Sequence, residues 1–266
     1  MKDDKQKDKR ILMAHQVAGY PDDGTCLAAG EALIAGGADI LEVQLAFSDP
    51  SADGAAIQTA CSAVLAAGYT VRRGMDYVRE IRRRHPETPV YIMTYASLAY
   101  RPGIGSFVQM AADAGAAGLI IPDLPFDHDE GLGAACRERG IRHVPVAAPS
   151  MTAGRLEAMA HGGYECIYTA LRAGITGSKT VITPEMLGFI GKASSGGAKI
   201  FGGFGITDAR QAEQLAPHVH AVVAGSVFVN LITKNYDARN AGASCEKIAA
   251  ALRAKAAELA GLSGAE

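Results

Sequence analysis

Short apolar runs alternate along the chain with longer segments whose apolar residues recur at helical spacing. The apolar runs are bounded by Gly, Pro or Asp, which is typical of strands. There are eight of them, at residues 11–17, 39–45, 89–95, 117–123, 141–147, 165–171, 198–204 and 218–225. Alanine-rich amphipathic stretches such as residues 25–38, 105–116 and 130–140 lie between them and predict helices. Strands that alternate with helices indicate parallel strands joined by crossover helices.

The number of strand and helix pairs predicts the fold class. Eight pairs in 266 residues match a (β/α)8 TIM barrel, whose chain is typically roughly 250 residues long. A doubly wound open sheet is the alternative, but it would carry a glycine-rich phosphate turn after its first strand. The glycine-dense turns here follow the seventh and eighth runs, where barrels bind phosphate. We therefore expect an α/β protein with one barrel domain over residues 11–266, preceded by a charged tail over residues 1–10.

Composition excludes several classes of partner. The net charge is -2, and the lysines and arginines are scattered, so no basic stripe is available for nucleic acid. The five cysteines lie far apart and include no C-x-x-C pair, which argues against a disulfide framework or a zinc site. The first ten residues lack the apolar core of a signal peptide, and the most apolar run is too short to span a bilayer. We expect a cytoplasmic protein without a nucleic-acid or membrane partner.

Residues 39–45 place a carboxylate inside a predicted strand. Because side chains alternate across a strand, Ile40, Glu42 and Gln44 share one face, and the all-apolar opposite face must pack under the helices. Glu42 should therefore point into the barrel, where loss of water disfavours the charged carboxylate and suits it to proton transfer at neutral pH. The alternative is a buried glutamate that hydrogen bonds satisfy, although glutamate is seldom fully buried.

The loop that follows, "FSDPSADG", is predicted to lie at the carboxyl-terminal mouth of the barrel, where active sites of this fold are built. Asp49 before Pro50 has the chemistry of an ordinary turn. Asp53 before Gly54 could equally be a turn former or a helix cap. Taken alone, either aspartate is more simply structural.

Taken together, these residues resemble the active-site segment of the tryptophan synthase alpha subunit family, which reads roughly L-E-x-G-x-P-F-S-D-P-x-A-D-G-P. Other motifs resemble the same family in the same order: "VAGYP" after the first strand, "PDLP" after the fourth, "RAGITG" after the sixth, and "GGFGI" and "AGS" at the phosphate turns. Several motifs in order at these spacings make the resemblance specific, whereas a lone G-x-G would be weak. It extends over nearly the whole chain.

The resemblance implies a lyase of tryptophan biosynthesis that cleaves indole-3-glycerol phosphate into indole and glyceraldehyde 3-phosphate by a retro-aldol reaction. It assigns Glu42 as the general acid and base and Asp53 as the carboxylate that holds the indole N–H. Neither role requires a metal or another cofactor. Tyr168 matches a tyrosine that lines the site near the glutamate, although an ordinary core tyrosine is an equal alternative.

The resemblance also implies a phosphate site. Its predicted residues are Thr176, Gly177, Gly203, Phe204, Gly205, Gly225 and Ser226. Glycines let backbone N–H groups approach phosphate oxygens, and the residues after Gly225 would begin a helix whose N-terminus favours an anion. The glycines could instead form plain turns, but two such turns after the last two strands favour a phosphate site.

Departures from the family pattern cluster around the predicted indole pocket and the partner surface. His15 stands where the family has an aromatic residue that contacts the indole ring, Gln44 replaces a glycine, and Ser97 replaces an asparagine. Ala46 and Ala55 replace prolines that the family uses in contact with a beta subunit, so that an alpha2beta2 contact is expected to differ here.

These departures leave two alternatives beside the lyase. One is a paralogous barrel lyase that acts on a different and more polar phosphorylated substrate. The other is a non-catalytic subunit that binds a phosphometabolite. If the lyase interpretation is right, His15 and Gln44 should turn away from the pocket.

Overall fold

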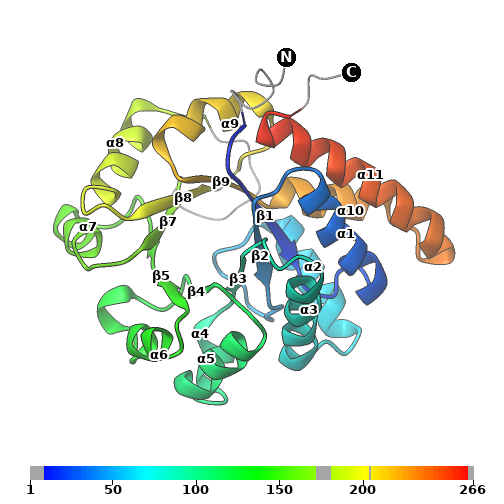
Figure 1. The fold of residues 1–266 in the computed structure, drawn as a ribbon, viewed down its shortest axis with the longest axis horizontal. Coiled ribbons are helices and arrows are strands. Elements are labelled where there is room, and N and C mark those ends of the chain that lie inside the picture. The colour runs from blue at the N-terminus through cyan, green and yellow to red at the C-terminus, as the bar shows by residue number, and fades with distance from the viewer. Residues whose placement is uncertain (1–8, 172–180, 204, 263–266) are drawn as a thin grey trace.

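The computed structural model describes residues 9–171, 181–203 and 205–262. In these residues nine parallel strands form one sheet in the order β5-β4-β3-β2-β1-β9-β8-β7-β6. The sheet curls into a nearly closed barrel with the helices outside it (Figure 1). The single-barrel fold class is therefore confirmed. Residues 1–8 of the expected N-terminal tail lie outside the described residues.

The strands and helices follow one another in the expected alternation. The strands are β1 (Leu12–Val17), β2 (Ile40–Gln44), β3 (Val90–Met93), β4 (Gly118–Ile120), β5 (Arg142–Val144), β6 (Val146–Ala147), β7 (Cys166–Ala170), β8 (Lys199–Gly203) and β9 (Ala221–Ala224). The α-helices are α1 (Asp23–Ala35), α2 (Ala55–Ala66), α3 (Val71–Arg84), α4 (Ala96–Tyr100), α5 (Ile104–Asp113), α6 (Leu132–Glu138), α7 (Ala153–Ala160), α8 (Pro184–Ala193), α9 (Ala209–Leu215), α10 (Ser226–Asn235) and α11 (Ala241–Ala260). The 3-10 turns are η2 (Phe126–His128), η3 (Ala216–His218) and η4 (Ala238–Asn240).

The fifth predicted strand is divided in two. Pro145 separates β5, which pairs with β4, from β6, which pairs with β7. A proline has no N–H to donate to a neighbouring strand, so the ladder is interrupted there. The carbonyl oxygen of Pro145 still accepts a hydrogen bond from the Tyr168 N–H at 2.9 Å, so β7 remains bonded to the chain at this interruption.

Alternation along the strands divides the core in two. Met13, Ile40 and Phe201 belong to a cluster inside the barrel, whereas Leu41 and Val43 belong to a larger cluster between strands and helices. Ile40 thus lies on the interior face of β2 and Leu41 on the exterior face, as the alternation predicted. This pattern fixes Glu42 on the interior face.

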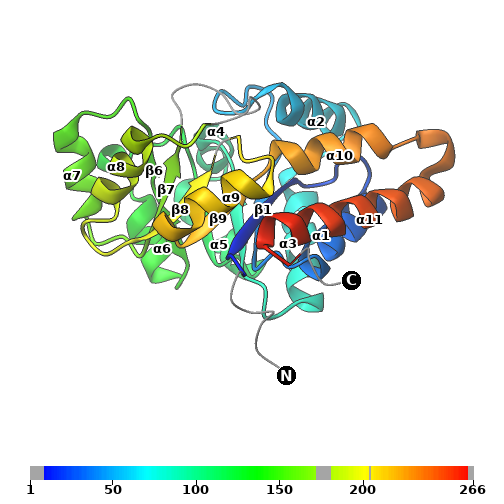
Figure 2. The same cartoon turned by 90° about the horizontal axis from the view of Figure 1, so that it is seen from above.

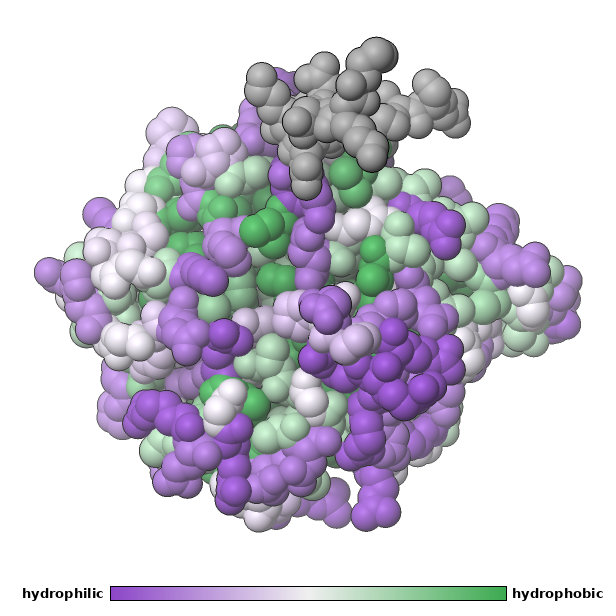
Figure 3. All heavy atoms as spheres, viewed as in Figure 1, coloured by the Kyte–Doolittle hydropathy of each residue, from purple (hydrophilic) through white to green (hydrophobic). Residues whose placement is uncertain are grey.

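The helices have polar outer surfaces and capped ends. Asp22, Thr70 and Asp208 accept the backbone N–H groups that open α1, α3 and α9. Arg83 and Arg84 at the end of α3 pair with Glu80, and Figure 3 shows dense hydrophilic surface over this helix. None of the helices in the described residues is both long and apolar enough to cross a membrane.

The carboxyl ends of the strands meet on one side of the barrel. Figure 2 shows α2 and α4, which follow β2 and β3, together on that side. In a (β/α)8 barrel this mouth is where the loops assemble a site. The loops after β2, β4 and β9 all bring residues to the cavity described next.

Candidate active site

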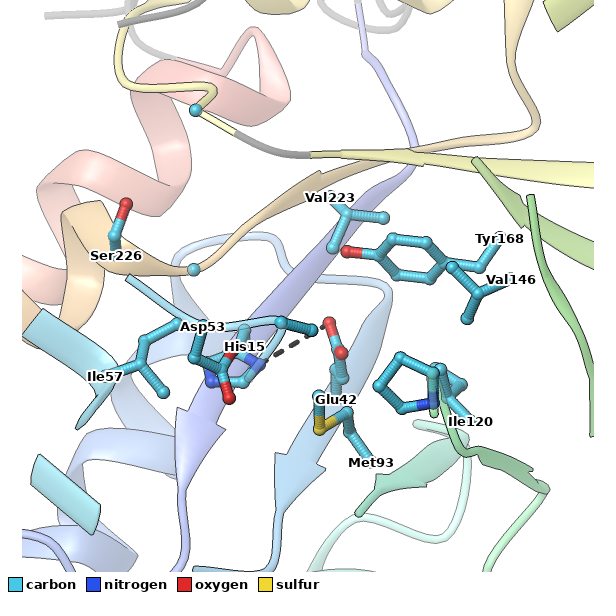
Figure 4. Close-up of a pocket in the computed structure, with 14 residues that line it drawn as sticks. His15, Glu42, Asp53, Ile57, Met93, Ile120, Val146, Tyr168, Val223 and Ser226 are labelled. Atoms are coloured by element: carbon cyan, nitrogen blue, oxygen red, sulfur yellow. Dashed lines mark ion pairs between the residues drawn. The ribbon is translucent and has the colours of Figure 1, made fainter. Parts of the chain in front are cut away.

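A cavity opens at the carboxyl ends of the strands. Its walls combine polar and apolar residues (Figure 4). They are His15, Glu42, Ala52, Asp53, Ile57, Met93, Ile120, Pro122, Val146, Tyr168, Gly205, Val223, Gly225 and Ser226.

Glu42 projects from β2 into this cavity and is 3% exposed. Its Oε2 atom has no hydrogen-bond partner among the described residues. The nearest ionisable partner is His15 of β1, whose Nδ1 lies 3.6 Å from Oε2, at ion-pair distance but too far for a hydrogen bond (Figure 4). A buried carboxylate oxygen without a donor is available to a substrate.

Asp53 is held by two donors, one at the end of β2 and the other at the residue that precedes α4. Gln44 Nε2 and Tyr95 Oη each donate to Asp53 Oδ2 at 2.7 Å. Both donors contact the same oxygen, so neither occupies Oδ1. The helix cap of α2 is Gly54, and Asp53 lines the cavity. Asp53 therefore faces the cavity and does not cap the helix.

Burial dominates the electrostatics of Asp53. Loss of water raises the pKa of this carboxyl, and the nearby His15 charge and the bonds from Tyr95 and Gln44 only partly oppose the rise. The ionised form is thus less favourable in the folded protein than in the unfolded chain. Such perturbed carboxyls are typical of functional sites.

Tyr168 of β7 lines the cavity on the side opposite His15 and faces Glu42 (Figure 4). Burial, together with the charges of Glu42 and Asp53, raises the pKa of its phenol well above the usual value, so the group stays protonated at neutral pH. A Cβ atom on Gly203 would come within 2.9 Å of Tyr168 Oη. The bare backbone at Gly203 therefore leaves room for this ring.

Part of the predicted phosphate site lies at the same cavity. Gly205, Gly225 and Ser226 line it, and Ser226 opens α10. The first N–H groups of a helix have no intrahelical partner and can bind an anion. Gly205 has a φ of +82°, a conformation that favours glycine. Thr176, Gly177 and Phe204 lie outside the described residues.

Only one of the three pocket departures lines the cavity. His15 does, whereas Gln44 turns toward Asp53 and Cys61, and Ser97 is exposed on α4. Gln44 lies away from the pocket, as expected for the lyase, but His15 does not. Ala46 is buried and Ala55 is exposed at the start of α2.

Tyr95 is a site residue that sequence reasoning did not identify. It is fully buried, donates to Asp53, accepts the Ala52 N–H at 3.1 Å and stacks on Phe47. Its position at the carboxyl end of the third predicted strand was the signal, because barrel sites draw on several strand ends. Asp123 of the "PDLP" loop accepts a hydrogen bond at 2.9 Å from the backbone N–H of Ala96, the residue that follows Tyr95.

The remaining walls are apolar. Ile57, Met93, Ile120, Val146 and Val223 surround the two carboxylates. Such a lining suits a flat hydrocarbon ring better than a polar one. Across the described residues no three His, Cys, Asp or Glu side chains cluster so as to hold a metal ion.

The contribution of the hydrogen bond from Gln44 to Asp53 can be measured through the free energy of unfolding. Replacing Gln44 by methionine keeps the volume but removes the donor, and should lower the free energy of unfolding by roughly 1–3 kcal/mol. Urea denaturation measures the change. Gln109→Met, on the exposed face of α5, is the matched control and should change stability by no more than about 0.5 kcal/mol. Equal losses in the two variants would contradict the role given to Gln44.

Comparisons with known proteins agree with this geometry. The family model "Tryptophan synthase alpha chain" matches residues 1–258. The tryptophan synthase alpha chain of Helicobacter hepaticus is 37% identical over 232 residues, covering 85% of this chain and 87% of that protein. The Opitutus terrae protein is 35% identical over 256 residues, covering 95% and 93%.

Solved structures give the same result. Tryptophan synthase from Mycobacterium tuberculosis superposes with a TM-score of 0.83 at 30% identity, over 96% of this chain and 93% of that one. The tryptophan synthase a2b2 complex from Pyrococcus furiosus superposes with a TM-score of 0.83 at 29% identity, over 95% and 99%. Neither of the two alternatives is favoured by these relatives. Fold, cavity and relatives together show that this chain belongs to the tryptophan synthase alpha chain family.

Proposed function

We propose that this chain cleaves indole-3-glycerol phosphate into indole and glyceraldehyde 3-phosphate, as a carbon–carbon lyase of tryptophan biosynthesis. The observation that carries the proposal is the pairing of two buried carboxylates, Glu42 and Asp53, in one cavity with apolar walls. The retro-aldol reaction needs one group that moves protons at the ring carbon and the hydroxyl, and another that holds the ring nitrogen. The cavity offers one carboxylate for each task.

Asp53 is suited to the nitrogen. Its Oδ2 is fixed by Gln44 and Tyr95, so the carboxylate keeps its orientation while Oδ1 accepts the indole N–H. Positive charge develops on the ring nitrogen when the neighbouring ring carbon is protonated, and a fixed carboxylate stabilises that charge without reorganising.

Glu42 is suited to the carbon and the hydroxyl. In its protonated form it donates a proton to the ring carbon that bears the glycerol chain. The resulting carboxylate then takes the proton of the adjacent hydroxyl as the carbon–carbon bond breaks, which leaves an aldehyde and restores the indole ring. The proton count balances, and Glu42 returns to its starting form. Its unpartnered Oε2 supports this role.

The rest of the substrate fits the remaining surfaces. The indole ring would lie against Ile57, Met93 and Ile120, and the phosphate would meet the N–H groups at Gly225 and Ser226. Holding both ends of the substrate limits its motion at the carboxylates, which is itself a large part of catalysis.

A beta chain is the expected protein partner. The related Pyrococcus furiosus chain is part of an a2b2 complex. Ala46 and Ala55 flank the loop that follows β2. We therefore propose an association with a tryptophan synthase beta chain in which these two positions make contacts that differ from those of prolines.

The experiment is turnover of indole-3-glycerol phosphate by the purified chain, alone and with a tryptophan synthase beta chain. Glyceraldehyde 3-phosphate is followed through a coupled dehydrogenase, and indole is measured separately in the reaction without the beta chain. We expect equal amounts of the two products and faster release when the beta chain is present. No release under either condition would contradict the proposed activity.

A further inference from the structure

His15 lies between the two halves of the candidate site. On one side, its Nδ1 is 3.6 Å from Glu42 Oε2. On the other, the ring packs against the turn that begins α10, because a Cβ atom on Gly225 would come within 3.1–3.4 Å of His15 Cβ, Cγ and Cδ2. A ligand that reaches from Glu42 to this turn would therefore lie beside the His15 ring.

The other ring nitrogen of His15, Nε2, makes no hydrogen bond with the described residues. The side chain is only 5% exposed. A buried polar group without a partner is destabilising. His15 lines the cavity, so a bound ligand can supply the missing acceptor.

The charges around the ring are negative. Glu42 faces it from β2 and Asp53 from the loop before α2, while Gly225 and Ser226 from the β9–α10 turn carry no charge. Tyr168, across the cavity on β7, is a protonated phenol. Burial disfavours the charged imidazolium, but the two carboxylates outweigh it and raise the pKa of His15 above 6.5.

The same charges create a problem for an anionic ligand. The described residues that line the cavity include two carboxylates and neither lysine nor arginine. A phosphate monoester adds a charge of roughly -1.5 to -2 near pH 7. A protonated His15 is the cation available in this lining to offset that charge, and as an imidazolium it carries a donor at Nε2 as well as at Nδ1.

We propose that His15 is a further substrate-binding residue, whose Nε2–H donates a hydrogen bond to an oxygen of the substrate's glycerol phosphate chain. The inference rests on the proposed function, because it takes the substrate to be an indole joined to such a chain. The ring part offers no acceptor oxygen and lies against apolar walls, whereas the chain carries hydroxyl and phosphate oxygens. His15 thus selects for the phosphorylated, oxygen-bearing half of the substrate.

The test separates the two halves of the ligand. Glycerol 3-phosphate and indole are titrated separately into wild type, His15→Phe and His15→Gln, with binding measured by calorimetry at about pH 6 and about pH 8.5. His161→Phe, an exposed histidine at the end of α7, is the matched control. Because the ligand's phosphate also titrates, each variant is compared with wild type at the same pH.

We expect His15→Phe to weaken glycerol 3-phosphate binding about tenfold at the lower pH and by less at the higher pH. Indole binding should be unchanged or tighter, because the pocket becomes more apolar. His15→Gln keeps a neutral donor, so it should retain part of the affinity but lose the pH-dependent part. The His161→Phe control should match wild type throughout.

Two results would overturn the proposal. One is glycerol 3-phosphate affinity in His15→Phe equal to wild type at the lower pH, and the other is no binding by wild type at either pH. The proposed function fails separately. A wild type whose glycerol 3-phosphate binding depends on His15, but which does not cleave indole-3-glycerol phosphate, contradicts the lyase activity and leaves the role of His15 intact.

Discussion

Replacing Glu42 by glutamine is expected to lower kcat for indole-3-glycerol phosphate cleavage by roughly 10²–10⁴-fold. Glutamine has almost the same size, so the buried position on β2 remains filled. It can neither give a proton to the ring carbon nor take one from the hydroxyl. KM should change little, because the substitution leaves unchanged the apolar residues proposed to hold the indole ring and the turn proposed to bind the phosphate.

Steady-state release of glyceraldehyde 3-phosphate measures this effect. Glu157→Gln, an exposed glutamate on α7 that does not line the cavity, is the matched control and should keep wild-type activity. Circular dichroism and the melting temperature show whether the Glu42 variant is folded. A folded Glu42→Gln variant with kcat near wild type would remove Glu42 from the mechanism.

Asp53→Asn is expected to have two opposite effects. Activity should fall by roughly 10²–10³-fold, because a neutral amide does not stabilise the charge that develops on the ring nitrogen. Stability at neutral pH should rise by about 1 kcal/mol, or roughly 2–4 °C in melting temperature. The asparagine oxygen can still accept from Gln44 and Tyr95.

The gain in stability should depend on pH. The pKa of Asp53 is raised above its ordinary value of 3.8, chiefly by burial. A carboxyl with a raised folded-state pKa contributes stability below the unfolded-state pKa, and this contribution is lost as pH rises through the folded-state value. The advantage of Asp53→Asn over wild type should therefore be larger at about pH 8 than at about pH 5.

Thermal unfolding of both proteins across this pH range measures the difference. Asp113→Asn, an exposed aspartate on α5, is the control, and its melting temperature should stay close to wild type at every pH. If Asp53→Asn melts below wild type at neutral pH, the ionised carboxylate stabilises the fold, and the account of its burial is wrong.

Local patterns were enough to predict the barrel and the placement of Glu42. Alternation along β2 places Glu42 on the interior face. The opposite orientation would turn the apolar side chains of β2 away from the helices and place Glu42 among them. The final predicted strand was too long, since η3 takes up residue 218 and β9 begins at Ala221.

Side-chain partners far apart in sequence could not be predicted. The bond from Tyr95 to Asp53 spans 42 residues and depends on how two loops meet. Alternation predicted that Gln44 shares the interior face with Glu42. The side chain instead adopts a rotamer in which its Nε2 reaches Asp53 and Cys61, and alternation alone does not specify a rotamer. Ser97 lies on the short helix α4, where strand alternation has already ended, and this is why it is exposed.

The break at Pro145 divides the barrel wall into parts of unequal cohesion. β1 and β2 are aligned over five residue pairs, whereas β4 with β5 has three and β6 with β7 has two. Local opening is cheapest where the fewest bonds must break together. The wall with His15 and Glu42 is therefore more rigid than the wall at β5 and β6, beside Val146, where local opening costs least. Accommodation of differently sized ligands therefore falls to the side of the cavity away from Glu42.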